Sequence, residues 1–328
     1  MSSAFLVRLR PVGPCRFGPE DGSRTRTSSI GRSDTFYAAL SAAFEQLGLK
    51  EDWIGATAAT ADPSVRVSSL FPTLGRLLYV APPQSLWPPD ASPRLRWKAA
   101  SLVPTTVVQD LGLRKPLREE RWEIDTASEC LIPAGGLPPF RVNVRRLAAV
   151  DRVGASVEPH QTACLEFNNN AGFWAAILFA SEGSLETWGS RIRAALKILA
   201  DSGLGGERGI GWGHFETPEI QQGAFPDMLM PEWRGLPVSE AQWLLSVFNP
   251  ASSDSVNWSA GRWAVETRSR ADSQTVKMVK EGSVLSAPAP LTGRAVDLAR
   301  ADRGRPLWRN GFAVAIPLPV PPVEETSA

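Results

Sequence analysis

The chain has 328 residues, of which 43% are hydrophobic, and its 35 lysines and arginines almost equal its 34 acidic residues. This length predicts two domains, each large enough to bury its own core. The net charge of +1 excludes a uniformly basic surface, so any nucleic-acid-binding face must come from local clusters of charge.

The three cysteines are widely spaced, which argues against a disulfide framework and against a zinc site. No metal or other cofactor is therefore expected. No segment is apolar and long enough to span a membrane, and the N-terminus lacks an apolar signal region. The expected location is the cytoplasm, with no membrane partner.

The N-terminal elements follow from their periodicity. Alternating side chains from Phe5 to Leu9 predict a strand with one buried face. After a loop, Ser33 is the expected N-cap of a helix that ends at Gly48. A second strand with a hairpin partner is predicted from Val67 to Val80.

The stretch from about Asp90 to Gln161 is too long for a simple connection within a compact domain. We therefore expect an insertion that is functional or partly disordered. Basic residues gather between Arg94 and Arg121 and again at Arg141, Arg145, Arg146 and Arg152. Such runs are usually solvated faces. They indicate nucleic-acid binding only if the fold brings them close to another candidate site.

A buried strand is predicted from Gly172 to Ala180. A helix capped by Ser184 follows, then a glycine-rich loop, then a strand from Trp212 to Glu216. One apolar stripe is predicted along the helix, formed by Leu185, Trp188, Ile192, Ala195, Leu196 and Leu199. This order of strands and helices is the split β-α-β arrangement of a ferredoxin-like (RRM-like) fold. It predicts an N-terminal ferredoxin-like domain over residues 1–218.

Residues 219–328 are expected to form a second, smaller ferredoxin-like domain, so the predicted class is α+β with two such domains. A helix is expected near Val296 to Arg300, and the proline-rich tail should fray. Further strands are predicted at Trp243–Phe248, Trp258–Arg268, Val276–Leu285 and Phe312–Leu318.

The glycine-rich loop, Gly203–Gly213, holds six glycines and one arginine. Glycine allows positive φ and close approach of the backbone, so the loop can offer amide donors to phosphate. The dinucleotide fingerprint does not fit, because its third glycine would fall on Arg208 and the loop leads from helix to strand. A merely flexible connection is the alternative.

Several segments together resemble one family. They are Arg32–Leu40, Ser68–Pro72, Ala149–Gly154, Glu281–Ser283 and Leu307–Phe312, in addition to the glycine-rich loop. In order and spacing they are similar to landmarks of the repeat-associated mysterious protein (RAMP) superfamily of CRISPR systems. Within it, the chain resembles the fourth Csm protein, the guide-RNA 5′-tag-binding subunit of type III-A effector complexes.

This resemblance implies a non-catalytic subunit that holds the 5′ tag of the guide RNA. The implied protein partners are the large polymerase-like (cyclase-like) subunit and a backbone RAMP subunit, which extends as a filament. By analogy, part of the insertion would act as a thumb that reaches target RNA near the first guide position.

The candidate RNA contacts combine backbone amides, cations and aromatic rings, as single-stranded RNA requires. Several have a structural alternative: Trp212 can pack in the core, and Ser33 can simply cap its helix. Arg145, Arg146 and Arg152 can be ordinary surface residues. The full set is Arg16, Phe17, Ser33, Thr35, Arg145, Arg146, Arg152, His160, Gly203, Gly205, Gly206, Arg208, Gly209, Gly211, Trp212 and His214.

The main alternative is a RAMP-type endoribonuclease that processes precursor guide RNA, with His214 as the proton donor. A related endonuclease typically carries its glycine-rich loop near the C-terminus, whereas over a hundred residues follow the loop here. No metal cluster or catalytic triad can be nominated from spacing. A nucleotide-binding enzyme is a third class, supported by the glycines alone.

Overall fold

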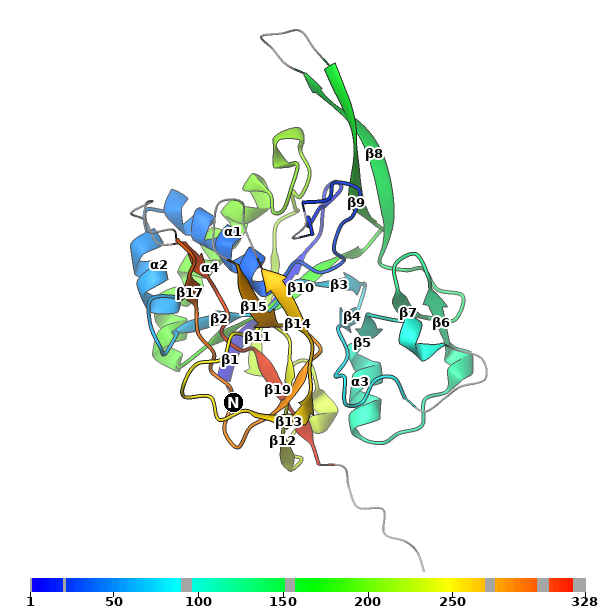
Figure 1. Cartoon of the computed structure of the whole chain (residues 1–328), viewed down its shortest axis with the longest axis vertical. Helices are drawn as coiled ribbons and strands as arrows, with labels where there is room; N and C mark the ends of the chain where they lie inside the picture. The colour runs from blue at the N-terminus through cyan, green and yellow to red at the C-terminus, as the bar shows by residue number, and fades with distance from the viewer. Residues whose placement is uncertain are drawn as a thin grey trace, which may run out of the picture.

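The computed structural model describes residues 2–19, 22–89, 96–150, 157–268, 275–299 and 307–320. It is a mixed α+β protein with several antiparallel sheets (Figure 1), which confirms the α+β part of the predicted class. The largest sheet has seven strands in the order β11-β1-β10-β3-β4-β5, with β2 also paired to β10. Its strands are β1 (Ser2–Leu9), β2 (Val65–Val67), β3 (Phe71–Leu74), β4 (Leu77–Val80), β5 (Val103–Pro104), β10 (Ala171–Phe179) and β11 (Glu219–Phe225).

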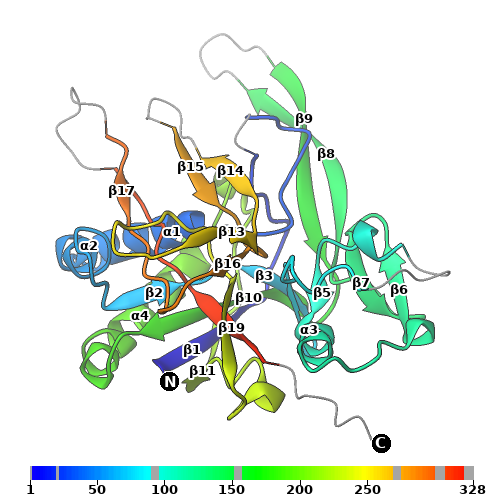
Figure 2. The ribbon, with the colours of Figure 1, turned by 60° about the horizontal axis from the view of Figure 1, so that its bottom comes forward.

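Helices α1 (Ser33–Gln46) and α4 (Glu182–Ser202) pack against each other, and α4 also contacts β1 and β10. A short helix that the sequence did not predict, α2 (Lys50–Thr57), packs beside α1 (Figure 2). The predicted apolar stripe of α4 is confirmed, because Trp188, Ile192 and Leu199 are buried.

Both predicted N-caps are wrong. Arg32 precedes α1, and the Ser33 hydroxyl instead accepts a hydrogen bond from the amide of Val247 at 3.0 Å. The N-cap of α4 is Ser181, whose hydroxyl accepts a hydrogen bond from the amide of Ser184. Serine is a good cap at several nearby positions, so sequence alone does not select between them.

The strand predicted at Trp212–Glu216 is displaced. Gly213 has φ +71°, and its amide donates to the carbonyl of Pro14, so the chain turns there. The edge strand beside β1 is instead β11, which begins at Glu219. It therefore lies beyond the predicted boundary at residue 218.

The insertion is largely folded. Its α3 (Thr105–Gly112) packs on β4 and β5, and β6 (Trp122–Asp125) pairs with β7 (Cys130–Pro133). The remainder is a long hairpin of β8 (Phe140–Val150) and β9 (Val157–Phe167), which projects from the body in Figure 1. The hairpin base is anchored by paired hydrogen bonds between Cys15 and Leu165.

The C-terminal unit, residues 226–320, contains a four-stranded antiparallel sheet and two strand pairs. Its described residues contain no α-helix, and the helix expected near Val296 is wrong because that residue begins a strand. The sheet consists of β12 (Val238–Leu244), β13 (Asn257–Arg262), β16 (Val284–Ser286) and β19 (Ala315–Pro319). The pairs are β14 (Val265–Arg268) with β15 (Val276–Val279), and β17 (Val296–Asp297) with β18 (Trp308–Arg309).

The two units share one core. Phe5 and Phe173 of the large sheet belong to the same buried cluster as Trp243, Leu245 and Ile316 of the C-terminal unit. Residues 4–7 of β1 are all buried, so the prediction of a single buried face for this strand is wrong. The large sheet is covered on both faces because the second unit packs onto it.

Candidate nucleic-acid interface

A groove of about 690 Å³ runs between α1, the glycine-rich loop and β18. Its charged side chains are mostly basic, since five cations accompany two carboxylates, Asp34 and Glu45. Trp308 adds aromatic surface, whereas Tyr37 is only 2% exposed. The cations are Arg16, Lys50, Arg208, Arg268 and Arg309.

Glycine is required where the glycine-rich loop meets the Arg16 segment. Gly205 has φ +93°, and a Cβ there would lie 2.3 Å from the carbonyl oxygen of Arg16. The amide of Gly206 donates to the same carbonyl at 2.8 Å. The loop therefore sets the position of the Arg16 backbone at the edge of the groove.

The expected cradle of exposed amides is mostly absent. The amides of Gly203, Gly206, Gly211 and Gly213 all donate to carbonyls of the protein. Within the described residues, the amides of Gly205 and Gly209 make no such bond. Three of these carbonyls, those of Leu199, Arg16 and Pro14, lie outside the loop, so most of the bonded amides tie the loop to neighbouring segments of the protein.

Asp34 lies beneath the groove with a side chain that is 0% exposed. The Arg268 guanidinium donates to both carboxylate oxygens at 2.9 Å, and Arg309 donates to Oδ2 at 2.7 Å. Arg268 also donates to the Thr35 hydroxyl at 3.1 Å. A carboxylate from α1 thus fixes two arginines of the C-terminal unit at the groove.

Burial alone would raise the pKa of Asp34, but the charges of Arg268 and Arg309 outweigh it. The pKa of this carboxyl is therefore held below its usual value of 3.8. Asp34 stays ionised at neutral pH. It is a structural anion rather than the helix-dipole residue that its place in the first turn of α1 suggests.

A second buried ion-pair group lies beside the first. Arg32 pairs with Glu266 of β14 and with Glu281, and Glu281 accepts a hydrogen bond from the Ser69 hydroxyl. The Glu281 side chain is 1% exposed and that of Arg32 is 14% exposed. These pairs join the start of α1 to the C-terminal unit from a second direction.

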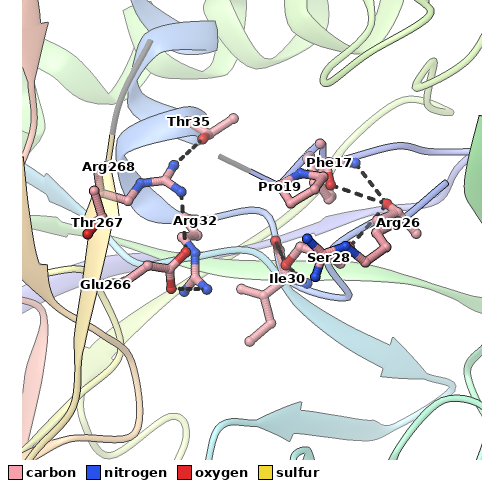
Figure 3. A pocket seen from close by; sticks show the side chains of 12 residues that line it. Phe17, Pro19, Arg26, Ser28, Ile30, Arg32, Thr35, Glu266, Thr267 and Arg268 are labelled. Atoms are coloured by element: carbon pink, nitrogen blue, oxygen red, sulfur yellow. Dashed lines mark hydrogen bonds and ion pairs between the residues drawn. The ribbon is translucent and has the colours of Figure 1, made fainter. Parts of the chain in front are cut away.

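A smaller pocket of about 270 Å³ adjoins the groove, with which it shares Phe17, Gly18, Thr35 and Arg268. Figure 3 shows Glu266 and Arg32 paired on one side, with Phe17 and Pro19 on the other. Its remaining lining residues are Arg26, Thr27, Ser28, Ile30 and Thr267.

The structure brings together seven of the predicted site residues. Arg208 is exposed, and Phe17, although 5% exposed, lines both the groove and the pocket while its ring packs edge-on against Phe173. The seven that line the groove are Arg16, Phe17, Thr35, Gly203, Gly205, Gly206 and Arg208.

The other predicted residues do not line the groove. Trp212 is 4% exposed and takes the buried alternative that the sequence left open. Ser33 is 0% exposed and neither caps α1 nor lines the groove, because its hydroxyl accepts from the amide of Val247. Gly209, Gly211 and His214 lie outside the groove lining.

Three further predicted residues, Arg145, Arg146 and His160, are on the β8–β9 hairpin. Arg145 and Arg146 are exposed, and Arg145 pairs with Glu166 at 2.6 Å. His160 pairs in register with Leu147. Arg152 lies outside the described residues.

Sequence reasoning missed Lys50, Arg268, Trp308 and Arg309 of the groove. Three of them come from the C-terminal unit, far from the glycine-rich loop in sequence. The available signal was the resemblance itself, since Arg32–Leu40, Glu281–Ser283 and Leu307–Phe312 were recognised as landmarks. Their convergence on one ion-pair network explains why these segments stand out together.

No group of three or more metal-ligating side chains gathers among the described residues, and none of their helices is long and apolar enough to cross a membrane. The geometry therefore defines an antiparallel α+β protein with a basic groove composed from both of its units.

Comparison with solved structures gives this fold a closer description. A chain of the Csm1–Csm4 cassette in complex with cA4 matches with a TM-score of 0.61 at 19% identity, covering 97% of this chain and 99% of its own length. A chain of the Csm3–Csm4 subcomplex in the type III-A CRISPR-Cas interference complex matches with a TM-score of 0.64 at 15% identity, covering 95% and 99%. Csm4 is common to both assemblies, and this chain has the Csm4 fold. No family model matches the sequence, and no curated protein matches it.

Proposed function

We propose that the protein is an RNA-binding structural subunit of a type III-A CRISPR interference complex. In this proposal it holds the 5′ tag of the guide RNA and joins the large cyclase-like subunit to the backbone filament. The observation that carries the proposal is the composite groove, where exposed Arg208 and the anchored Arg268 and Arg309 lie along one channel. A chain of cations beside aromatic surface suits a single strand of RNA.

The topology supports a RAMP fold. The strand order β11-β1-β10-β3, with α1 and α4 as the crossovers, is the order of a ferredoxin-like unit. We infer one such domain, which ends at Phe225 rather than at residue 218. The C-terminal unit supplies a second four-stranded antiparallel sheet, and we infer a reduced ferredoxin-like domain whose described residues lack the helices.

The partners are proposed from the solved relatives, which were determined with Csm1 or with Csm3. The β8–β9 hairpin is the proposed thumb, because it projects from the body and exposes Arg145 and Arg146 (Figure 2). It would reach target RNA near the first guide position. Neither of these assignments requires a chemical step.

Endoribonuclease activity is not favoured by the geometry. Neither histidine lines the groove, and no metal-ligating group gathers among the described residues. We therefore propose a non-catalytic role. Incubation with precursor guide RNA, with and without magnesium, tests this directly, and cleavage that is lost in His214→Ala would replace the binding proposal with an enzyme.

The central experiment measures binding of a fluorescent single-stranded RNA as a function of salt. Arg208→Ala is expected to weaken binding and to reduce the slope of log Kd against log salt by about one, as for loss of one phosphate contact. The matched control is Arg234→Ala, which removes an arginine whose side chain is 72% exposed and lies outside the groove lining. Equal behaviour of the two variants, or equally tight binding of a mononucleotide, would contradict the proposal.

A further inference from the structure

The pocket beside the groove carries a carboxylate in an otherwise basic site. Glu266 and Thr267 come from β14, while Phe17, Pro19 and Ile30 lie on the facing wall (Figure 3). The Glu266 carboxylate sets the pocket apart, because it can accept hydrogen bonds from a ligand. Like the groove, the pocket is otherwise cationic, since Arg26, Arg32 and Arg268 also line it.

Glu266 is partly open to this pocket, with 24% of its side chain exposed. Its Oε2 pairs with Arg32, and its Oε1 lies 3.5 Å from a guanidinium nitrogen of Arg268. An ionised carboxylate has about four acceptor positions, so two arginine contacts leave capacity for further donors. The same contacts hold the carboxylate in one orientation.

The apolar part of the pocket suits a flat ring. Phe17, Pro19 and Ile30 line the wall opposite β14. Ser28, Thr267 and Arg26 line the rest. An aromatic heterocycle with both donor and acceptor groups on its edge matches this lining.

Among the four RNA bases, guanine alone presents two adjacent donors on its Watson–Crick edge, N1–H and the N2 amino group. A carboxylate accepts both at once, and the guanine O6 beside them requires a cationic or neutral donor. Uracil, cytosine and adenine each present a single donor group on that edge. A fixed carboxylate flanked by arginines therefore discriminates in favour of guanine.

We propose that this pocket binds the Watson–Crick edge of one unpaired guanine of the RNA in the adjoining groove, with Glu266 as the specificity-determining residue. The proposal rests on the proposed RNA-binding function and deepens it, since it assigns base selectivity to one subsite. The guanine would enter from the groove past Phe17 and Thr35, which line both cavities. Its O6 would face the donors Arg26 and Arg32.

The first test is selection from a short single-stranded RNA library of randomised sequence by the full-length protein. Retained RNA is expected to be enriched in guanine at one position for the wild-type protein and not for Glu266→Gln. Glu240→Gln, an exposed acidic residue outside the pocket lining, is the matched control and should keep the enrichment. Enrichment that is absent from the wild-type protein, or equal in Glu266→Gln, would overturn the proposal.

The second test avoids any mutation of the protein. Replacing the selected guanosine by inosine removes only the N2 amino group, and we expect about tenfold weaker binding to the wild-type protein. Equal affinity for the two RNAs would refute the guanine subsite. Absence of RNA binding altogether would instead refute the proposed function, so the two failures are distinguishable.

Discussion

At the residue scale, Asp34 is the residue on which the groove depends. Removing one partner from a buried, hydrogen-bonded ion pair leaves uncompensated charge, which costs about 3–5 kcal/mol. We therefore predict that Asp34→Asn lowers the free energy of unfolding by about that amount at pH 7, measured by urea denaturation. Asp52→Asn, an exposed first-turn carboxylate of α2, is the control and is expected to change it little.

The ionisation of Asp34 also predicts that the free energy of unfolding depends on pH. Because the pKa of Asp34 is lower in the folded protein than its usual 3.8, its charge contributes stability above that value. This contribution is lost as the pH falls through the folded-state pKa. The difference in unfolding free energy between wild type and Asp34→Asn is thus expected to be full at pH 7 and to shrink below pH 3.8. A constant difference down to acid pH would contradict this account.

Sequence reasoning placed Asp34 at a helix N-terminus but could not identify its partners. Arg268 and Arg309 lie 234 and 275 residues further along the chain. Nothing local distinguishes a carboxylate near a helix dipole from one that will be buried between two arginines. Local patterns did place Arg16, Thr35 and Arg208 in one site, because a glycine-rich loop and a helix N-terminus are both visible in sequence.

At the element scale, the glycine-rich loop offers a paired test of its geometry. Gly205→Ala forces a Cβ against the Arg16 carbonyl at positive φ and is expected to cost about 1–3 kcal/mol. Gly209→Ala meets no atom within 4 Å and is expected to change stability by less than about 0.5 kcal/mol. Thermal unfolding of the two variants checks this, and equal effects would show that the loop does not hold the Arg16 segment.

The hairpin of β8 and β9 gives a second prediction at this scale. Replacing residues 146–161 by a short Asn-Gly turn joins the paired residues Arg145 and Thr162 and keeps the anchor at Leu165. We expect the melting temperature to stay within about 3 °C and binding of tag RNA to persist. Binding of a guide–target duplex is expected to weaken, and a large loss of stability would instead make the hairpin structural.

Elements with strong periodicity were predicted well from sequence, including β3 with β4, β10 and the apolar stripe of α4. The predictions of secondary structure failed where tertiary contacts outweighed the local preference of the sequence. The strand expected at Trp212–Glu216 is a turn because Gly213 bonds back to Pro14, and the helix expected near Val296 is a strand because it pairs with β18. Pro14 is far from Gly213 in sequence and could not be inferred from a local window. β18 follows β17 closely, but each strand has too few residues to show a strand periodicity.

At the scale of the whole molecule, the shared core predicts that the two units fold together. Ending the chain after Phe225 would remove Trp243, Leu245 and Ile316 from the cluster that covers the large sheet. We expect the truncated protein to be insoluble or to lack a cooperative transition, whereas the full chain unfolds in one calorimetric step. Two separate transitions in the full chain would contradict this prediction.

The ion-pair network also constrains how such a chain can change through evolution. Positions 32, 34, 266, 268, 281 and 309 hold three positive and three negative side chains that are joined by pairing contacts. Replacing one of these side chains by a neutral one would leave its oppositely charged partner buried without a counter-ion. Substitutions at these positions are therefore expected to occur in compensating pairs. An alignment of homologous sequences is then expected to show correlated substitutions at these six positions, although they are spread over most of the chain.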